Sequence, residues 1–163
     1  ISEFKEFFRR YRQGYDSIIL IANSIGAYFS MCALNHERVD KAFFISPIVD
    51  MEKLILDMMG WADITEEKLR EKQLITTGFG ETLSWEYLCY VRNHPVNWSV
   101  PTYILYGDND NLTSQETIHR FANDVNAELT IMENGEHWFH TTEQMTFLDD
   151  WIRGLLKGSY GVI

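Results

Sequence analysis

The stretch IILIANSIGAYFS, which runs from Ile18 to Ser30, decides the fold of this chain. Its first part is a continuous apolar run, which is typical of a strand buried on both faces of a sheet. From Ile25 onward the pattern becomes that of a helix whose beginning is rich in small residues such as Gly26. Ser24 stands between the two elements. It is therefore either a structural turn residue or a nucleophile presented on a sharp strand-to-helix turn.

Strands and helices alternate outward from this stretch. Three later apolar runs predict buried strands, and helical patterns lie between and after them. An amphipathic helix with aromatic residues on one face precedes the stretch and ends near Gly14. Alternation of this kind implies βαβ units, and hence a mainly parallel sheet of about four strands with flanking helices. The later strands are expected at 41–46, 102–107 and 128–133, and the later helices at about 114–124 and 142–156.

Residues 48–99 interrupt this alternation, because the segment is too long for a simple crossover between two strands. The segment carries helical signals of its own, with Thr65 and Ser84 as candidate N-caps and His94-Pro95 as a helix stop. We expect a helical cap inserted over one end of the sheet. The alternative is a set of extra helices packed on a face of the sheet. Either way, residues 1–163 are expected to form one domain that contains the insertion.

The composition limits the partners of this protein. The net charge is −10, which argues against binding to nucleic acid or to anionic membrane surfaces and leaves neutral or cationic small molecules as substrates. No apolar run reaches the roughly 18 residues of a membrane-spanning helix. Cys32 and Cys89 have no metal-type spacing, and two such thiols predict a reducing, cytoplasmic location.

Polar residues that can carry chemistry follow three of the predicted strands. Ser24 follows the first strand, Asp108 and Asp110 follow the third, and His137 follows the fourth. Because ligands of open α/β sheets bind beyond the carboxyl ends of the strands, a hydroxyl, a carboxylate and an imidazole are expected to meet at one edge. Their order along the chain is Ser, Asp, His.

This order and placement resemble those of the α/β-hydrolase superfamily of serine hydrolases. The sequence ANSIG resembles its nucleophile elbow around Ser24, YGDNDNLT its acid loop and NGEHWFHT its histidine loop. The resemblance covers nearly the whole chain. It implies a partial α/β-hydrolase fold with Asp110 as the acid, Gly107 as the turn before it, and His137 as the base. Asp108 and His140 remain the alternatives for the acid and the base.

The chemistry of each residue can be stated separately. A serine hydroxyl is a weak nucleophile and needs a base, for which His137 is the candidate, and Asp110 would hold that base in one tautomer. The N–H of Ile25, at the beginning of the helix, is the natural oxyanion donor. We expect Ala22 and Gly26 to be small because larger side chains would collide across the tight turn. This chemistry needs no cofactor.

Five residues are candidates for substrate binding. They are Met58, Met59, Trp61, Trp85 and Trp138. The first four lie in the insertion, where the alternative is that they form only its own core. A metal site at His137 and His140 is a further alternative, but no HExxH motif or carboxylate cluster supports it, so no metal is expected.

The expected activity is hydrolysis of a small neutral ester, thioester or amide, as in a carboxylesterase. Acyl transfer to another acceptor uses the same triad, and the alternative from another class is a non-catalytic binding or scaffold module. In the α/β-hydrolase superfamily several strands and a loop with a second oxyanion donor normally precede the nucleophile strand, whereas here only a helix does. We therefore expect either a fragment with little turnover, a reduced binding domain, or a homo-oligomer. The oligomer would form through the open edge of the strand SIILIA, which runs from Ser17 to Ala22.

Overall fold

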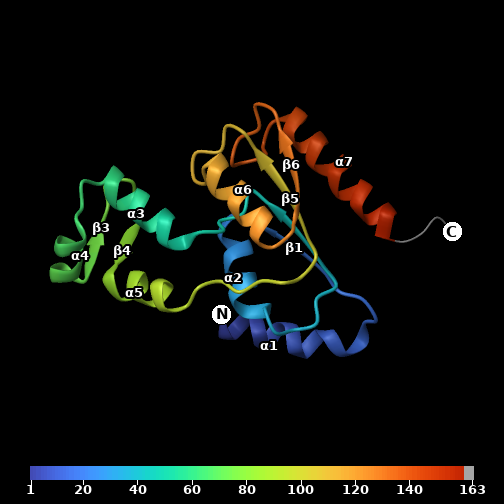
Figure 1. Ribbon diagram of the computed structural model, residues 1–163, viewed down its shortest axis with the longest axis horizontal. Helices are drawn as coiled ribbons and strands as arrows, with labels where there is room; N and C mark the ends of the chain where they lie inside the picture. The colour runs from blue at the N-terminus through green and yellow to red at the C-terminus, as the bar shows by residue number, and fades with distance from the viewer. Residues whose placement is uncertain (160–163) are drawn as a thin grey trace. The chain divides into compact units, whose positions relative to one another are not determined.

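The computed structural model describes residues 1–159, and Figure 1 shows the path of the chain. These residues form two compact units. Unit 1 combines Ile1–Val49 with the chain from Asn97 onward, and unit 2 is Asp50–Val96. The sequence predicts that the inserted segment caps the site. This depends on how unit 2 is placed against unit 1, so it stays a prediction.

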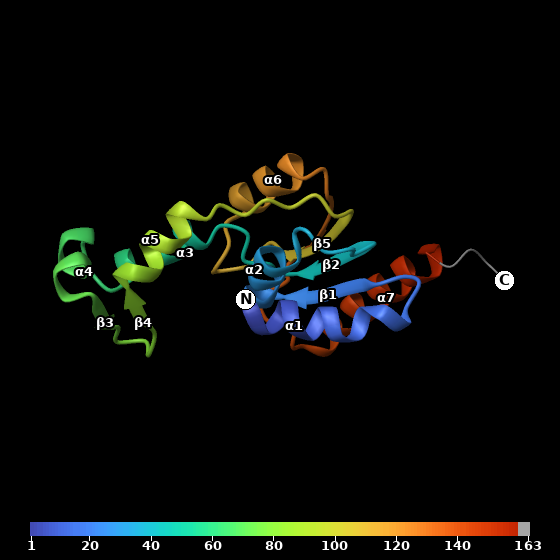
Figure 2. The same ribbon diagram turned by 90° about the horizontal axis from the view of Figure 1, so that it is seen from below.

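Unit 1 is built on a four-stranded sheet in which every neighbouring pair of strands is parallel. The order β1-β2-β5-β6 confirms the predicted mainly parallel sheet, and β1, β2 and β5 can be followed in Figure 2. In the register, Asn23 pairs with Ile45 and Ile45 pairs with Leu105. The first residues after β1 and β2 therefore lie at the same level of the sheet. The strands are β1 (Ile19–Asn23), β2 (Lys41–Ile45), β5 (Thr102–Gly107) and β6 (Glu128–Met132).

Four α-helices and one 3-10 helix complete unit 1. The helix α2 contacts both β1 and β2, whereas α6 contacts β6. Within residues 1–159, no helix has both the length and the apolar composition that a bilayer crossing requires. The helices are α1 (Ser2–Tyr11), the 3-10 helix (Arg12–Gly14), α2 (Ser24–Leu34), α6 (Gln115–Asp124) and α7 (Thr142–Ser159).

The centre of the sheet is buried on both faces, because consecutive side chains of a strand point to opposite sides. Phe43 and Phe44 of β2 are both fully buried. The ring of Phe43 meets Trp151 of α7 at a centroid distance of 6.0 Å, and that of Phe44 meets Trp98 at 5.8 Å. The unbroken apolar run of β2 therefore reflects packing on two faces.

The strand β1 differs from the strand expected over the same stretch. It begins at Ile19 rather than Ser17, and Ile21 is 48% exposed, so the prediction of burial on both faces was wrong here. The physical reason is position, because β1 is an edge strand of the described sheet. The open edge expected at this strand is present in the part of the chain that the structure describes.

Unit 2 contains the predicted helices and also a short β-hairpin that the sequence did not predict. Thr65 and Ser84 act as N-caps as expected, since their side chains accept from the backbone N–H of Lys68 and Tyr87 respectively. The antiparallel strands pair with Ile75 opposite Leu83. The elements are α3 (Met51–Trp61), α4 (Glu66–Lys72), β3 (Leu74–Thr76), β4 (Thr82–Ser84) and α5 (Trp85–Asn93).

Candidate active site

Ser24 sits on a strained turn at the end of β1. Its φ angle is +47°, in the left-handed region that non-glycine residues seldom adopt, and it begins α2 directly after the strand. Strain of this kind collects at functional sites. The neighbouring Gly26 is less constrained than expected, because the nearest atom to an added Cβ would be Asn23 Oδ1 at 4.0 Å. The expected collision at this position is therefore absent.

The hydroxyl of Ser24 contacts the imidazole of His137, which lies in the loop after β6. The distance from Ser24 Oγ to His137 Nε2 is 2.8 Å. On the other side of the ring, His137 Nδ1 lies 2.8 Å from Asp110 Oδ2. A carboxylate only accepts hydrogen bonds, so Nδ1 carries the proton and Nε2 is left to accept from the Ser24 hydroxyl. The three side chains stand in the order that general-base activation of a serine requires.

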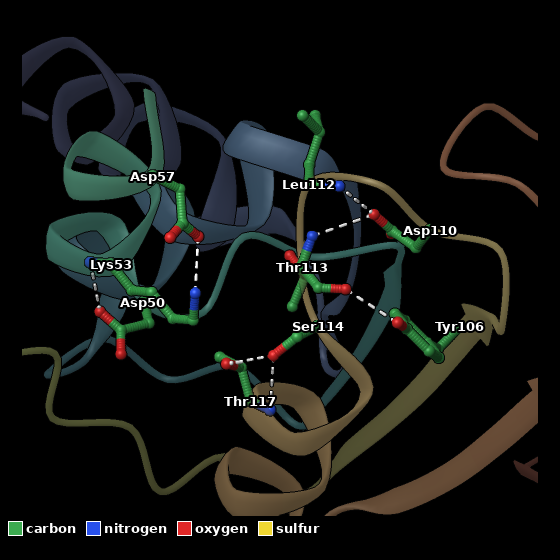
Figure 3. Close-up of polar contacts among 9 residues, drawn as sticks. All are labelled: Asp50, Lys53, Asp57, Tyr106, Asp110, Leu112, Thr113, Ser114 and Thr117. Carbon is green, nitrogen blue, oxygen red and sulfur yellow. Dashed lines mark hydrogen bonds and ion pairs between the residues drawn. The ribbon is translucent and has the colours of Figure 1, made fainter. Parts of the chain in front are cut away.

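The structure distinguishes Asp110 from its neighbour Asp108. The side chain of Asp110 is fully buried and meets His137, whereas Asp108 is exposed. Asp110 is also held from behind, because its Oδ1 accepts from the backbone N–H of Leu112 at 2.8 Å and of Thr113 at 3.0 Å (Figure 3). These two bonds leave Oδ2 for the imidazole. Together with the imidazole, they give the Asp110 carboxylate three N–H donors.

Two glycines bring the acid loop and the histidine loop together. A Cβ added at Gly107 would lie 2.3 Å from the backbone oxygen of Gly135, a distance that real Cβ atoms do not reach. The contact is fixed by a backbone hydrogen bond of 2.9 Å from Asn109 N–H to Gly135 O. The sequence predicted a turn at Gly107 but missed the role of Gly135. The available signal was a glycine at the end of β5 and another three residues after the end of β6.

The backbone around Ser24 also offers donors for an oxyanion. Ile25 lies in the first turn of α2, where backbone N–H groups have no partner within the helix. Asn23, the N-cap, makes no side-chain cap hydrogen bond that would occupy these donors. The Ile25 N–H therefore follows the candidate nucleophile directly in the chain, at the positive end of the helix dipole.

One side chain beside the triad has a shifted pKa. Burial, followed by the charges of Asp110 and Asp108, raises the pKa of Tyr106 to about 12. Tyr106 therefore stays a neutral hydrogen-bond donor near neutral pH. Its hydroxyl donates to the backbone oxygen of Thr113 at 2.8 Å, behind the acid loop (Figure 3).

Of the predicted substrate-binding residues, Trp138 lies beside the triad. Its side chain is 74% exposed and borders a surface hollow of about 560 Å³. His137 lines the same hollow, so the space opens next to the candidate base. His140 lines it too, and its Nδ1 lies 3.2 Å from Glu136 Oε2, away from the acid that His137 uses. The remaining lining residues are Asn109, Asn111 and Glu136.

The other four substrate candidates belong to unit 2. Met59 is buried in the core of that unit, which is the second role that the sequence left open for it. Trp61 is 55% exposed, and its ring meets that of Phe79 at 6.2 Å. Met58 and Trp85 are partly exposed. Their part in substrate binding stays a prediction.

Residues 1–159 contain no group of three or more His, Cys, Asp or Glu side chains arranged to hold a metal ion. The pair His137 and His140 was the only metal site that the sequence raised. In the described chain the two histidines have different partners, which are Asp110 for His137 and Glu136 for His140.

No protein-family model matches the sequence, and no curated protein matches it. Several solved structures do match. Alpha/beta hydrolase domain-containing protein 10 from mouse aligns with a TM-score of 0.72 at 14% identity over 95% of this chain and 68% of that one. Est1E from Butyrivibrio proteoclasticus aligns with a TM-score of 0.71 at 15% identity over 93% of this chain and 65% of that one.

The esterase domain from a Rhodothermus marinus protein aligns with a TM-score of 0.62 at 10% identity over 92% of this chain and 64% of that one. The chain thus spans about two thirds of the length of these structures. At such low identities the likeness concerns the fold. Together with the parallel sheet and the strained serine turn after β1, it shows that this chain has the α/β-hydrolase fold.

Proposed function

We propose that this protein is a serine hydrolase that acts on a small neutral ester, thioester or amide. The observation that carries the proposal is an unbroken chain of two hydrogen bonds that runs from Ser24 through His137 to Asp110. Each bond is 2.8 Å long. A hydroxyl bonded to a bare imidazole nitrogen is poised to lose its proton to that nitrogen. The α/β-hydrolase fold supports the proposal. Because one fold can host many functions, the main support is the arrangement of the three side chains in the site.

In the proposed reaction, Ser24 Oγ attacks the substrate carbonyl while its proton passes to His137 Nε2. The resulting oxyanion accepts the N–H of Ile25. His137 then gives the proton to the leaving alcohol, thiol or amine as the bond to the carbonyl carbon breaks, which leaves an acyl-enzyme. Water attacks the acyl carbon, passes its proton through His137, and releases the acid and free Ser24. Asp110 remains ionised throughout and stabilises the imidazolium.

The hollow beside His137 is the proposed place for the leaving group, because this residue delivers the proton to that group. Trp138 offers an exposed indole on which a flat apolar group can pack. Glu136 lines the same hollow and the whole chain carries a net charge of −10, so an anionic leaving group is disfavoured. We also infer a cytoplasmic location, which the two free cysteines, Cys32 and Cys89, support.

The test is labelling by a fluorophosphonate probe, which reacts covalently with an activated serine. We expect one probe per chain, attached at Ser24, and no labelling of Ser24→Ala. Ser46→Ala is a matched control, because Ser46 also follows a strand and also has a positive φ, yet it is not part of the triad. Absence of labelling in the folded protein would contradict the hydrolase and favour a non-catalytic binding module.

A further inference from the structure

Thr113 joins the acid loop to another part of unit 1. It is 5% exposed, and each of its polar groups has a partner. Its backbone N–H donates to Asp110 Oδ1 at 3.0 Å, and its backbone oxygen accepts from the Tyr106 hydroxyl at 2.8 Å (Figure 3). Its own hydroxyl donates to the backbone oxygen of Pro47 at 3.2 Å. Only this last bond leaves the acid loop and its strand.

The segment that receives this bond also holds the nucleophile turn. Pro47 and Ile48 follow β2, and the N–H of Ile48 donates to the backbone oxygen of Ser24 at 3.1 Å. One end of the Pro47–Ile48 peptide unit therefore binds the acid loop through Thr113, and its other end binds the residue that carries the proposed nucleophile. Pro47 is buried, so its carbonyl has no ready access to water as a substitute partner.

These contacts close a ring. One side runs through the triad, from Ser24 to His137 to Asp110, and the other runs from Asp110 through Thr113 and the Pro47–Ile48 peptide back to Ser24. The side through Thr113 consists of backbone groups and one hydroxyl. It connects Asp110 with Ser24 by a route that does not pass through the imidazole.

We propose that Thr113 is a positioning residue of the triad, whose hydroxyl fixes the acid loop against the nucleophile turn so that His137 can bind both at once. This inference rests on the proposed function for its meaning, whereas its first test, the tautomer of His137, does not depend on that function. A threonine suits the role, because branching at Cβ restricts its side chain to few rotamers and so keeps the hydroxyl directed at one acceptor. Tyr106 fixes the same residue from the opposite side through a bond to its carbonyl.

The test compares Thr113→Val, which removes the hydroxyl at nearly constant shape, with Thr113→Ser, which retains it. The first measurement uses the ¹⁵N shifts of the His137 ring in the full chain, which report the ring tautomer without any turnover. The resonance is assigned by its loss in His137→Gln. We expect the wild type and Thr113→Ser to hold the proton on Nδ1. Thr113→Val should populate both tautomers and exchange the Nδ1 proton faster with solvent, because Asp110 is no longer held at one distance.

The second measurement is the rate of fluorophosphonate labelling at Ser24. We expect Thr113→Val to slow labelling by between about tenfold and a hundredfold, since small misplacements of catalytic groups have effects of this order. Thr113→Ser should restore most of the rate. Tyr106→Phe removes the bond to the Thr113 carbonyl and should shift the tautomer ratio in the same direction as Thr113→Val. It replaces Thr113→Val in the test if that variant is too unstable to study.

A purely structural role would lower the unfolding free energy of Thr113→Val and leave the His137 tautomer unchanged, and that result would overturn the inference. The two proposals can fail separately. A tautomer change in Thr113→Val without any labelling of the wild type would support the positioning role and contradict the hydrolase. Labelling of the wild type with no tautomer change in either Thr113→Val or Tyr106→Phe would support the hydrolase and contradict the positioning role.

Discussion

Two serines at the carboxyl ends of neighbouring strands show why backbone strain does not by itself mark a nucleophile. Ser24 has a φ of +47° and Ser46 a φ of +41°, and the residues before them, Asn23 and Ile45, are paired in the sheet. The hydroxyl of Ser24 meets His137, whereas the hydroxyl of Ser46 is buried without a hydrogen-bond partner among residues 1–159. The partner, and not the turn, is what distinguishes Ser24 from Ser46.

At the same scale, the choice between Asp108 and Asp110 leads to a direct prediction. Asp110→Asn should lower the labelling rate at Ser24 by about 10³–10⁴-fold, because an amide stabilises neither the required tautomer nor the imidazolium. Asp108→Asn should leave the rate nearly unchanged, since that side chain is exposed and does not meet His137. Equal losses in both variants would contradict the assignment. The measurement is labelling against time at one pH.

A second prediction at residue scale concerns the contact of Gly107 with Gly135. Gly107→Ala should destabilise the fold by about 1–3 kcal/mol or more, because the new methyl would need to occupy the space of the Gly135 backbone. The control is Gly154→Ala on α7, where an added Cβ meets no atom within 4 Å. That control should stabilise by up to about 1 kcal/mol, because alanine favours helices over glycine.

Unfolding by urea, followed by circular dichroism, measures both variants. The opposite signs are the informative result, because the two substitutions add the same methyl group. A Gly107→Ala variant as stable as the wild type would show that the acid loop and the histidine loop can separate without cost.

Among the elements, three helices of unit 2 are joined by one arginine on α5. Arg92 donates two hydrogen bonds to Glu66 at the beginning of α4, at 2.8 and 2.7 Å, and one to Glu52 of α3 at 2.6 Å. A two-pronged contact of this kind is geometrically specific. The hydrogen bonds from Arg92, assisted by its charge, hold the pKa of Glu66 below its usual range.

We expect Arg92→Gln to lower the unfolding free energy by about 1 kcal/mol at pH 7, since these side chains are partly exposed and screened by solvent. A carboxyl whose pKa is lowered by folding contributes stability above its unfolded value and loses it as the pH falls through its folded value. The difference between Arg92→Gln and the wild type should therefore shrink below about pH 4. Thermal unfolding at pH 7, 5, 4 and 3 measures this difference.

The matched control is Arg153→Gln on α7. Among residues 1–159, the ion pair of Arg153 is with Asp149, at 2.6 Å, and both side chains are more than half exposed. We expect no measurable change in stability for this variant. If both arginine variants behave alike at every pH, the contacts of Arg92 do not act as a joint between helices.

Short elements were the ones that the sequence predicted poorly. The hairpin of β3 and β4 has only three residues in each strand, which is too few to establish an alternating pattern. The turn between the strands contains Gly80 with a φ of +96°. A glycine alone indicates only a turn, and it is the pairing of β3 with β4 that makes the segment a hairpin. The long elements of unit 1 were predicted to within about one to three residues, because their apolar patterns are set by packing on the sheet.

At the scale of the whole molecule, the triad and all the contacts that hold it belong to unit 1. This unit is assembled from two stretches of chain that lie on either side of unit 2 in the sequence. Ser24 comes from the first stretch, and Asp110 and His137 come from the second. Closure of the triad thus requires the two stretches of unit 1 to pair in one sheet, through the contact of β2 with β5.

The open edge of unit 1 leads to the prediction that two copies associate. β1 is an edge strand, its Ile21 is 48% exposed, and a hollow of about 300 Å³ lies between α1 and the residues that lead into β1. Exposed strand edges favour pairing with another chain. We expect sedimentation velocity to show association that grows with protein concentration. Added salt should strengthen it, since each copy carries a charge of −10.

Ile21→Lys should weaken this association, because a charge on an exposed edge opposes pairing. Leu74→Lys is the control, since Leu74 is 62% exposed but lies in unit 2. A protein that stays monomeric at all concentrations would contradict the prediction. So would equal effects of the two substitutions.

The sequence by itself determined the alternation of strands and helices, the mainly parallel sheet and the placement of Ser24, Asp110 and His137 after strand ends. These features follow from local patterns of burial and from turn residues, which a single stretch of chain contains. Only the tertiary structure decided which carboxylate meets the imidazole, how closely two glycine-containing loops approach, and that Thr113 reaches Pro47. The last pair is 66 residues apart in the chain, so its contact depends on how the strands pair, which no local pattern specifies.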